Sequence, residues 1–185
     1  NMTIEESDFA ADDQYVIWQQ LEARGINWRM YQSDVPTPLG LYPRFAGRRL
    51  SRIKPIDQFF IDLAAGDLPP VVYIEPQFFQ GVDQSDEHPP ANPQFGQAFA
   101  HQVGSALMDS PIWERSAFVL TYDEHGGFYD HVVPPAACPP DGTAPELTPS
   151  DAPGGFDQLG FRVPLVVVSP YAKAGYVSAR VTDLT

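Results

Sequence analysis

Two short runs of the sequence, VVYI at residues 71–74 and LVVV at residues 165–168, are apolar throughout and do not alternate with polar residues. Runs of this kind are typical of strands that are buried on both faces of a parallel sheet. Two further runs are rich in β-branched and aromatic residues. Together they predict four strands, at Ile26–Tyr31, Val71–Glu75, Ala117–Tyr122 and Pro164–Ser169.

Helical patterns lie between the predicted strands. Apolar residues recur at helical spacing in Asp13–Arg24, Pro55–Ala65 and Phe95–Met108. Gly25 is suited to follow the end of the first helix, and Pro55 is suited to its position at the start of the second. Because helices alternate with strands, we expect an α/β fold with a layered, mostly parallel sheet, and four strands indicate that this sheet is incomplete.

The charge of the chain limits the functions it can have. The formal net charge is −13, and without a basic stripe the chain does not fit nucleic-acid binding. An anionic substrate would also be repelled, so a phosphate site would need a bound divalent cation, which eleven scattered Lys and Arg residues cannot replace. No window holds 18 uninterrupted apolar residues, so we expect no transmembrane segment.

Proline is abundant in the segment 132–160, which has neither helical nor strand periodicity. We therefore expect a long surface loop within a single domain that covers residues 1–185. Such a loop is either an insertion without a role or a flap at a substrate entrance.

The densest cluster of polar side chains is TYDEHGGFYDH, residues 121–131, at the end of the third predicted strand. Ligands of parallel α/β sheets bind outside the carboxyl ends of strands, where Asp123 and Glu124 would lie. Two carboxylates and two imidazoles suit a divalent cation. Adjacent strand residues point to opposite faces, however, so both acids reach one ion only if the chain has already turned, which Gly126-Gly127 would allow. The alternative is a polar strand-to-loop junction with capping carboxylates.

A second cluster is DEHPP, residues 86–90, where Pro89 restricts His88 to an extended backbone. The alternative for His88 is a solvated side chain without a role, which is also what we expect of His101. Glu75 either faces the same site or caps the backbone from Phe78 onward. No nucleophile elbow, P-loop or dinucleotide fingerprint is present.

Several strings together resemble a known family over nearly the whole chain outside the proline-rich segment. They are IWQQLEARGINWRMYQSDVP, EPQFF with DEHPP, SPIWERSAFVLTYDEHGGFYDHVVPP and LGFRVPLVVVSPYAKAGYV. This pattern resembles the phosphoesterase family that includes the non-specific phospholipases C of bacteria and plants and acid phosphatase A. The resemblance implies an alkaline-phosphatase-like α/β/α fold, and the DEHGG string disfavours a sulfatase or a phosphomutase of that superfamily.

The resemblance also implies roles for the clustered residues. Asp123 and Glu124 would be ligands of one divalent metal ion, which could be zinc, calcium or manganese. His88 would reach the phosphoryl oxygens or protonate the leaving group. His131 is the second catalytic candidate, and His125 would lie near it. The family mechanism uses a Ser or Thr nucleophile that forms a covalent phospho-enzyme, which water then hydrolyses. The resemblance also implies that the substrate is a phospholipid or a small phosphate ester.

This sequence departs from the family pattern at both ends. Nothing in Asn1–Gln32 matches the family's Asn-containing motif or its nucleophile, and the pattern continues past Thr185. We therefore expect the C-terminal part of a catalytic domain, inactive by itself. The family resemblance implies a secreted, periplasmic or cell-surface protein, for which peripheral contact with a membrane surface is possible. The alternative is a non-catalytic binding module that keeps the fold and a partial cation site.

Overall fold

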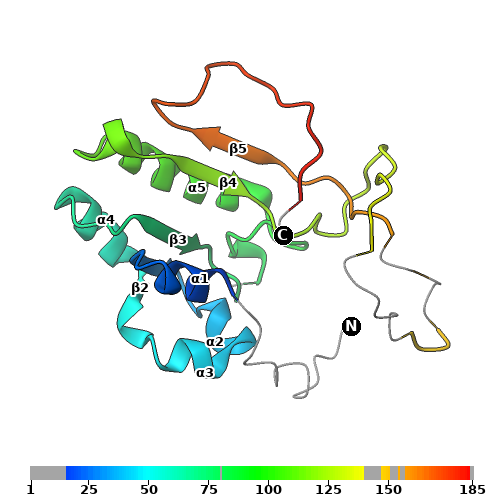
Figure 1. Ribbon diagram of the computed structural model, residues 1–185, viewed down its shortest axis with the longest axis horizontal. Helices are drawn as coiled ribbons and strands as arrows, with labels where there is room; N and C mark the ends of the chain where they lie inside the picture. Colours follow the sequence, from blue (N-terminus) through cyan, green and yellow to red (C-terminus); the bar gives the residue numbers. More distant parts are fainter. Residues whose placement is uncertain (1–15, 80, 140–146, 151–153, 155–156, 184–185) are drawn as a thin grey trace. The chain divides into compact units, whose positions relative to one another are not determined.

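The structure is a computed structural model that describes residues 16–79, 81–139, 147–150, 154 and 157–183 (Figure 1). The chain divides into two compact units, Asn1–Ser116 (unit 1) and Ala117–Thr185 (unit 2). Within the described residues, no helix is both long enough and apolar enough to cross a membrane.

A three-stranded parallel sheet forms the centre of unit 1. Its strands are β1 (Trp28–Gln32), β2 (Ile53–Pro55) and β3 (Val71–Glu75), in the order β2-β1-β3. Gln32, at the end of β1, pairs with Pro55 on one side and with Glu75 on the other. The carboxyl ends of all three strands therefore meet at one edge of the sheet.

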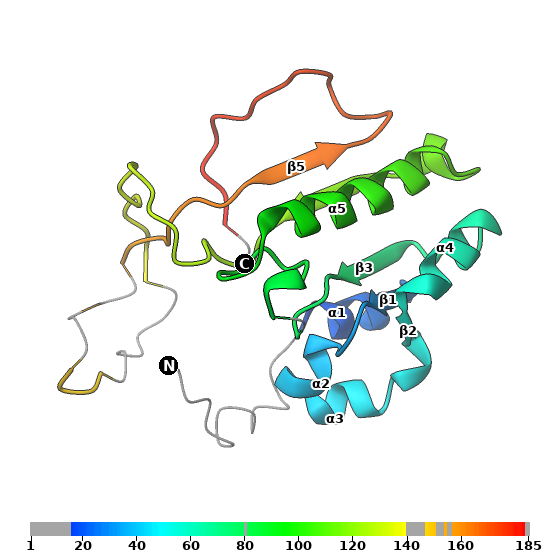
Figure 2. The ribbon, with the colours of Figure 1, turned by 180° about the vertical axis from the view of Figure 1, so that it is seen from behind.

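Helices connect and cover these strands. In both ribbon views α2 and α3 lie side by side (Figures 1 and 2). The longest helix, α5, begins at an N-cap where the Asn92 side chain accepts a hydrogen bond from the Gln94 N–H at 3.1 Å. The helical elements of unit 1 are α1 (Ile17–Ala23), α2 (Thr37–Leu41), α3 (Pro43–Gly47), η2 (Leu50–Arg52), α4 (Ile56–Ala64), η3 (Gly81–Asp83), α5 (Pro93–Met108) and η4 (Trp113–Arg115).

One face of the central strand β1 packs against α1 and α3. Trp28 and Met30 are two residues apart in β1, so both side chains point to this face, where they form a core cluster with Trp18 of α1 and Phe45 of α3. The rings of Trp18 and Phe45 lie 5.8 Å apart, and those of Trp28 and Phe45 lie 6.1 Å apart. Aromatic side chains bury the largest areas per residue, so this cluster fixes how α1 and α3 sit on the sheet.

The other face of β1 packs against α4. Tyr31 is fully buried, and its ring lies 5.4 Å from that of Phe59. Its hydroxyl donates to Asp62 Oδ2 at 2.6 Å, and Arg29 pairs with the same carboxylate. Burial alone would raise the pKa of Asp62, but hydrogen bonds from Tyr31, Gln58 and Arg29 lower it below its usual value. Asp62 is therefore a buried anion with its hydrogen bonds satisfied.

The described residues of unit 2 contain one pair of strands, β4 (Phe118–Thr121) and β5 (Leu165–Val168), which are antiparallel with Thr121 opposite Leu165. The prediction that Pro164–Ser169 holds a strand is confirmed. Its expected place, buried on both faces of a parallel sheet, is wrong. Three of the four β5 residues are exposed. An apolar strand is buried on both faces only where other secondary structure packs against each face of its sheet.

The VVYI run does form a strand of a parallel sheet, but it is not buried on both faces as expected, because Val71, Val72 and Ile74 are only partly buried and Tyr73 is 49% exposed. The other predicted elements agree with the structure in type. The predicted strands at Ile26–Tyr31, Val71–Glu75 and Ala117–Tyr122 correspond to β1, β3 and β4, and the predicted helices correspond to α1, α4 and α5, although residues 13–15 lie outside the described residues. Gly25, with φ 68°, follows the α1 C-cap as expected. The α/β class is confirmed, and the alkaline-phosphatase-like layering stays a prediction.

The proline-rich segment 132–160 is held together near its two ends. The Ala137 N–H donates to the Asp157 carbonyl at 2.8 Å, and the Leu159 N–H donates to the Pro135 carbonyl at 3.0 Å. An antiparallel bridge pairs Ala136 with Gln158. Residues 140–146, 151–153 and 155–156 lie outside the described part, so the choice between insertion and flap stays open.

Candidate functional site

Polar side chains gather at the carboxyl edge of the unit 1 sheet. Ser33 and Asp34 follow β1 directly, and Glu75 ends the neighbouring strand β3. The Ser33 hydroxyl donates to the Glu75 carbonyl at 3.1 Å. Gln32 Oε1 is buried there without a hydrogen-bond partner among the described residues. This edge is the position at which parallel α/β sheets bind ligands.

Glu75 is 4% exposed and accepts two hydrogen bonds from Thr37, the first residue of α2. The Thr37 N–H donates to Glu75 Oε2 at 3.0 Å, and the Thr37 hydroxyl donates to Glu75 Oε1. Burial raises the pKa of Glu75, and the two bonds from Thr37 partly oppose this effect. Glu75 thus ties β3 to α2.

Glu75 does not cap the backbone from Phe78, which was one of its two predicted roles. Asp34 does so instead, because its Oδ2 accepts from the Phe78 N–H at 2.8 Å and from the Phe79 N–H at 2.9 Å. Aspartate commonly binds backbone N–H groups in this way, but here it lies 44 residues from its partner, so no local pattern could have revealed the pairing.

His88 lies in an exposed turn between β3 and α5. Its backbone N–H donates to Asp86 Oδ1 at 3.2 Å, and its Nδ1 lies 2.8 Å from the Pro89 carbonyl oxygen. The preceding residue, Glu87, has a positive φ of 66°, which is unusual for a residue other than glycine. The local backbone around His88 is therefore tightly specified, while its catalytic role stays a prediction. His101 on α5 is exposed and lies 3.2 Å from the Ser105 hydroxyl.

In unit 2, Asp123 and Glu124 lie in a bend after β4, which ends at Thr121. Asp123 Oδ1 accepts from the Glu124 N–H at 3.0 Å, and Glu124 Oε2 accepts from the Gly126 N–H at 2.8 Å. Gly126 and Gly127 have φ values of 66° and 75°, which glycine adopts without strain. The chain has thus left the strand before the two acids, so strand alternation does not force their side chains apart.

The segment before β5 holds this loop at two points. The Phe161 ring lies 4.6 Å from the His125 imidazole. Arg162 binds Asp130 through two hydrogen bonds, from Nε to Oδ2 at 2.8 Å and from Nη2 to Oδ1 at 2.9 Å. These bonds hold the pKa of the Asp130 carboxyl well below its usual range. Phe161 and Arg162 were not predicted as site residues, although both lie in the LGFRVP string.

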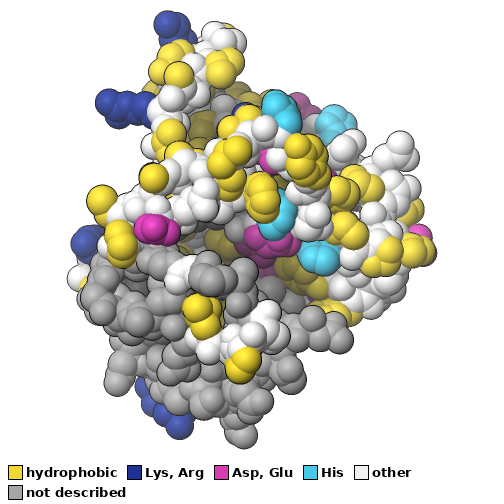
Figure 3. Space-filling view, turned by 90° about the vertical axis from the view of Figure 1, so that its right-hand side faces the viewer, with side chains coloured by type: hydrophobic (Ala, Val, Ile, Leu, Met, Phe, Trp, Pro, Cys, Tyr) yellow, Lys and Arg dark blue, Asp and Glu magenta, His cyan; other side chains and the backbone are white. Residues whose placement is uncertain are grey.

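The two imidazoles of the loop have different surroundings. His125 Nδ1 lies 3.4 Å from Glu124 Oε2, and its side chain is one-third exposed. His131 Nδ1 lies 3.6 Å from Asp130 Oδ1, but its side chain is 81% exposed. Figure 3 shows imidazole side chains at the surface of the molecule. A histidine that must exchange protons with a substrate needs such access.

The loop supplies donors of the type that hard and borderline divalent cations bind, namely the carboxylates of Asp123 and Glu124 and the imidazole of His125. Both oxygens of Asp130 are engaged by Arg162 and the Val132 N–H, so Asp130 serves to hold the loop. The described residues contain no group of three His, Cys, Asp or Glu side chains placed to hold a metal ion. The donors fit such an ion in type, and further ligands would be needed to complete its coordination.

Comparison with known proteins identifies what this chain is similar to. A family model described as "Phosphoesterase family" matches residues 5–185. Among curated proteins, the chain is 38% identical over 172 residues to non-specific phospholipase C6 of Arabidopsis thaliana, a match that covers 89% of the chain and 32% of that protein. It is 32% identical over 199 residues to the non-hemolytic phospholipase C of Pseudomonas aeruginosa, with 90% of the chain and 28% of that protein covered.

A third relative is phospholipase C A of Mycobacterium tuberculosis, which is 31% identical over 193 residues, with 90% of the chain and 36% of that protein covered. The chain therefore spans about a third of the length of the curated relatives it matches.

Proposed function

This chain belongs to the phosphoesterase family, and from that membership we propose that the whole protein hydrolyses phosphate ester bonds as a phospholipase C. The relatives that share 31–38% of its residues carry that name. The substrate class we propose is a phospholipid, with small phosphate esters as the alternative of the same chemistry.

The observation that carries the proposal is the loop after β4. It presents two adjacent carboxylates beyond the end of the strand, and Phe161 and Arg162 hold it at His125 and Asp130. A catalytic group must be held close to its productive position, and a loop fixed at two points meets this condition better than one fixed only by its ends.

We propose Asp123 and Glu124 as ligands of a divalent metal ion. When bound, such an ion stabilises the negative charge on the phosphoryl oxygens and lowers the pKa of an attacking hydroxyl. The residues of this chain would bind the ion through their carboxylates, and His125, beside Glu124, would orient that ligand. Zinc, calcium and manganese all remain compatible with carboxylate and imidazole ligands.

His88 and His131 are the proposed proton-transfer groups. Both are exposed, and an exposed imidazole is able to give a proton to the leaving oxygen of the ester. We propose that the nucleophile is a Ser or Thr of the whole protein that lies outside these 185 residues. The chain by itself is then inactive, since binding and electrostatic stabilisation remain without a group to attack phosphorus.

The test compares Asp123→Asn with Asp157→Asn in the whole protein. Asp157 is also exposed and also lies in unit 2, but outside the loop, so it controls for the loss of one carboxylate. We expect Asp123→Asn to lower phosphatidylcholine hydrolysis by two or more orders of magnitude and to release bound metal, measured by elemental analysis, while Asp157→Asn changes neither.

Equal activity and metal content in the two variants would contradict the assignment of Asp123. A protein that holds metal in stoichiometric amount but shows no turnover on any phosphate ester would be a binding module instead. Robust turnover by the 185-residue chain alone would contradict the proposed position of the nucleophile.

A further inference from the structure

The basic residues of this acidic chain are concentrated in one segment. Seven of the eleven Lys and Arg residues lie within residues 22–54, together with only two of the 24 acidic residues. That segment therefore carries a formal charge of +5, and the remaining residues carry −18. Such an asymmetry indicates contact with an anionic partner more directly than the net charge of −13 does.

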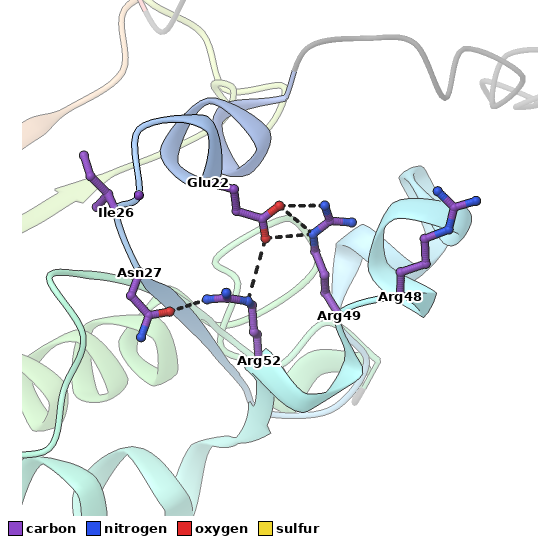
Figure 4. Close-up of a pocket in the computed structure, with 7 residues that line it drawn as sticks. Glu22, Ile26, Asn27, Arg48, Arg49 and Arg52 are labelled. Atoms are coloured by element: carbon purple, nitrogen blue, oxygen red, sulfur yellow. Dashed lines mark hydrogen bonds and ion pairs between the residues drawn. The ribbon is translucent and has the colours of Figure 1, made fainter.

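Three of these arginines line one pocket of about 630 Å³ in unit 1 (Figure 4). Asn27 directly precedes β1, and Arg52 directly precedes β2. The pocket therefore lies at the amino ends of the parallel strands, whereas Glu75 and Asp34 lie at their carboxyl ends. Its lining residues are Glu22, Gly25, Ile26, Asn27, Arg48, Arg49 and Arg52.

Glu22 holds two of the arginines in place. Arg49 donates to Glu22 from Nε at 2.8 Å and from Nη2 at 2.6 Å, and its guanidinium lies 4.0 Å from the centre of the Phe45 ring. Arg52 Nε lies 3.7 Å from Glu22, and Arg52 Nη1 donates to the Trp28 carbonyl at 3.1 Å. One carboxylate thus fixes two guanidinium groups, which leaves a fixed positive charge at the pocket wall.

Arg48 adds a third positive charge that this network does not use. It is exposed, and in the part of the chain that the structure describes its guanidinium makes no hydrogen bond or ion pair. In Figure 4 it extends from α3 beside the Glu22–Arg49 pair without joining it. With one acid against three arginines, the pocket has a formal charge of +2.

Two exposed leucines, Leu41 and Leu50, lie within the same segment of residues 22–54. Leu50 is 56% exposed and stands between Arg49 and Arg52 in the sequence, and Leu41, at the end of α2, is 45% exposed. A site for a free soluble anion gains nothing from exposed leucines. A lipid bilayer offers both partners, since phosphate headgroups pair with guanidinium and the acyl region accepts leucine.

We propose that Arg48, Leu50 and Arg52 form a docking surface for the phosphate headgroups of an anionic phospholipid bilayer. The guanidinium groups bind lipid phosphates, and Leu50 enters the interface between headgroups and acyl chains. The evidence for this docking is the local positive charge of the three arginines in the pocket and the exposure of Arg48 and Leu50. That it delivers the protein to its substrate rests on the proposed phospholipase C function.

The test is cosedimentation of the 185-residue chain with vesicles of phosphatidylcholine alone or with 30% phosphatidylglycerol, in EDTA. Under these conditions neither turnover nor a metal at Asp123 contributes, so a failure here is separate from a failure of the proposed function. We expect binding only to the anionic vesicles, and weaker binding at high salt. Each Lys or Arg near such a surface contributes about fivefold, so Arg48→Gln should lower binding about fivefold and Arg48→Glu about 25-fold.

Arg115→Glu is the matched control, because Arg115 is exposed in the same unit but does not line the pocket. Leu50→Gln should lower binding without changing its dependence on salt, and circular dichroism checks that each variant is folded. Equal binding to both vesicles, or an equal loss from Arg115→Glu and Arg48→Glu, would overturn the proposal. The proposal would also be overturned if the protein did not bind the vesicles but bound inorganic phosphate or a DNA duplex saturably and through Arg48.

Discussion

Substitution of Thr37 by valine tests whether Glu75 has a structural role or is a ligand. The change removes the hydroxyl that donates to Glu75 Oε1 and keeps the Thr37 N–H that donates to Oε2 at 3.0 Å. Because Glu75 is 4% exposed, water cannot replace the lost donor. A hydrogen bond to a charged group contributes about 1.5–3 kcal/mol, so we expect the free energy of unfolding of unit 1 to fall by about 2 kcal/mol at a pH above the folded-state pKa of Glu75, where its carboxyl is ionised.

The effect should depend on pH in a defined direction. Burial raises the folded-state pKa of Glu75, so its protonated form is favoured on folding. The stabilisation from this preference is fully present below the unfolded pKa and is lost as the pH rises through the folded pKa. The hydroxyl of Thr37 is one of the groups that oppose the rise, so Thr37→Val raises the pKa further. The cost of the substitution should therefore shrink below the folded pKa to about 1 kcal/mol, which is typical of a neutral pair.

Urea denaturation followed by tryptophan fluorescence measures this effect in unit 1 alone, because Trp18, Trp28 and Trp113 are the three tryptophans of the chain and all lie in that unit. Glu75→Gln is the matched control. Its amide can still accept from the Thr37 N–H and donate to the hydroxyl, and it carries no charge to bury. A Thr37→Val variant as stable as the wild type at pH 7 would refute the reasoning. A Glu75→Gln variant of unchanged stability that released metal would assign Glu75 to the ion.

Two further predictions concern close contacts within the units. A Cβ on the buried Gly96 of α5 would lie 2.6 Å from Glu87 Oε1 and closer still to the Cγ of Glu87. Gly96→Ala should therefore lower the melting temperature, although alanine has the better helix propensity. Adding Glu87→Ala to this variant should remove most of that loss, because it removes the side chain that the new Cβ would meet. Arg162→Gln should raise the pKa of Asp130 toward its ordinary value and speed hydrogen exchange at the Val132 N–H. The control Arg180→Gln should do neither, and NMR measures both quantities.

Local sequence patterns were sufficient for most of the elements. Helical spacing located α1, α4 and α5, and the VVYI run located β3 with its observed bounds. The short strand β2 was missed, since Ile53–Pro55 has only three residues and directly precedes the helix that Pro55 was expected to begin. Pairing could not be read locally either. The LVVV run has the composition of a buried parallel strand, but it pairs antiparallel with β4. The direction of pairing depends on the direction in which the neighbouring strand runs, which the composition of one strand does not show.

The candidate site shows the same division between local and distant information. The turn that carries Asp123 and Glu124 out of the strand was anticipated from Gly126-Gly127, because positive φ is a local requirement that glycine meets. The groups that hold the loop were not anticipated, since Arg162 lies 32 residues from Asp130 in the sequence. Asp34 was missed for the same reason. Long-range hydrogen bonds leave no periodic signal in a single sequence.

Net charge was the least informative of the composition arguments. The net charge is the sum of +5 over residues 22–54 and −18 over the other residues, so it does not show that the basic residues are concentrated in one segment. For this reason the pocket that three arginines share was not predicted. A phosphate ester approaching this protein responds to the local field within about 8 Å at physiological salt and not to the sum over the chain. The acidic bulk opposes non-specific contact with anionic surfaces, so binding is confined to the places where positive charge is concentrated. On this reasoning, the arginines at the amino ends of the strands and a cation held by Asp123 and Glu124 would each meet a phosphate group, one as a surface and the other as a reactive centre.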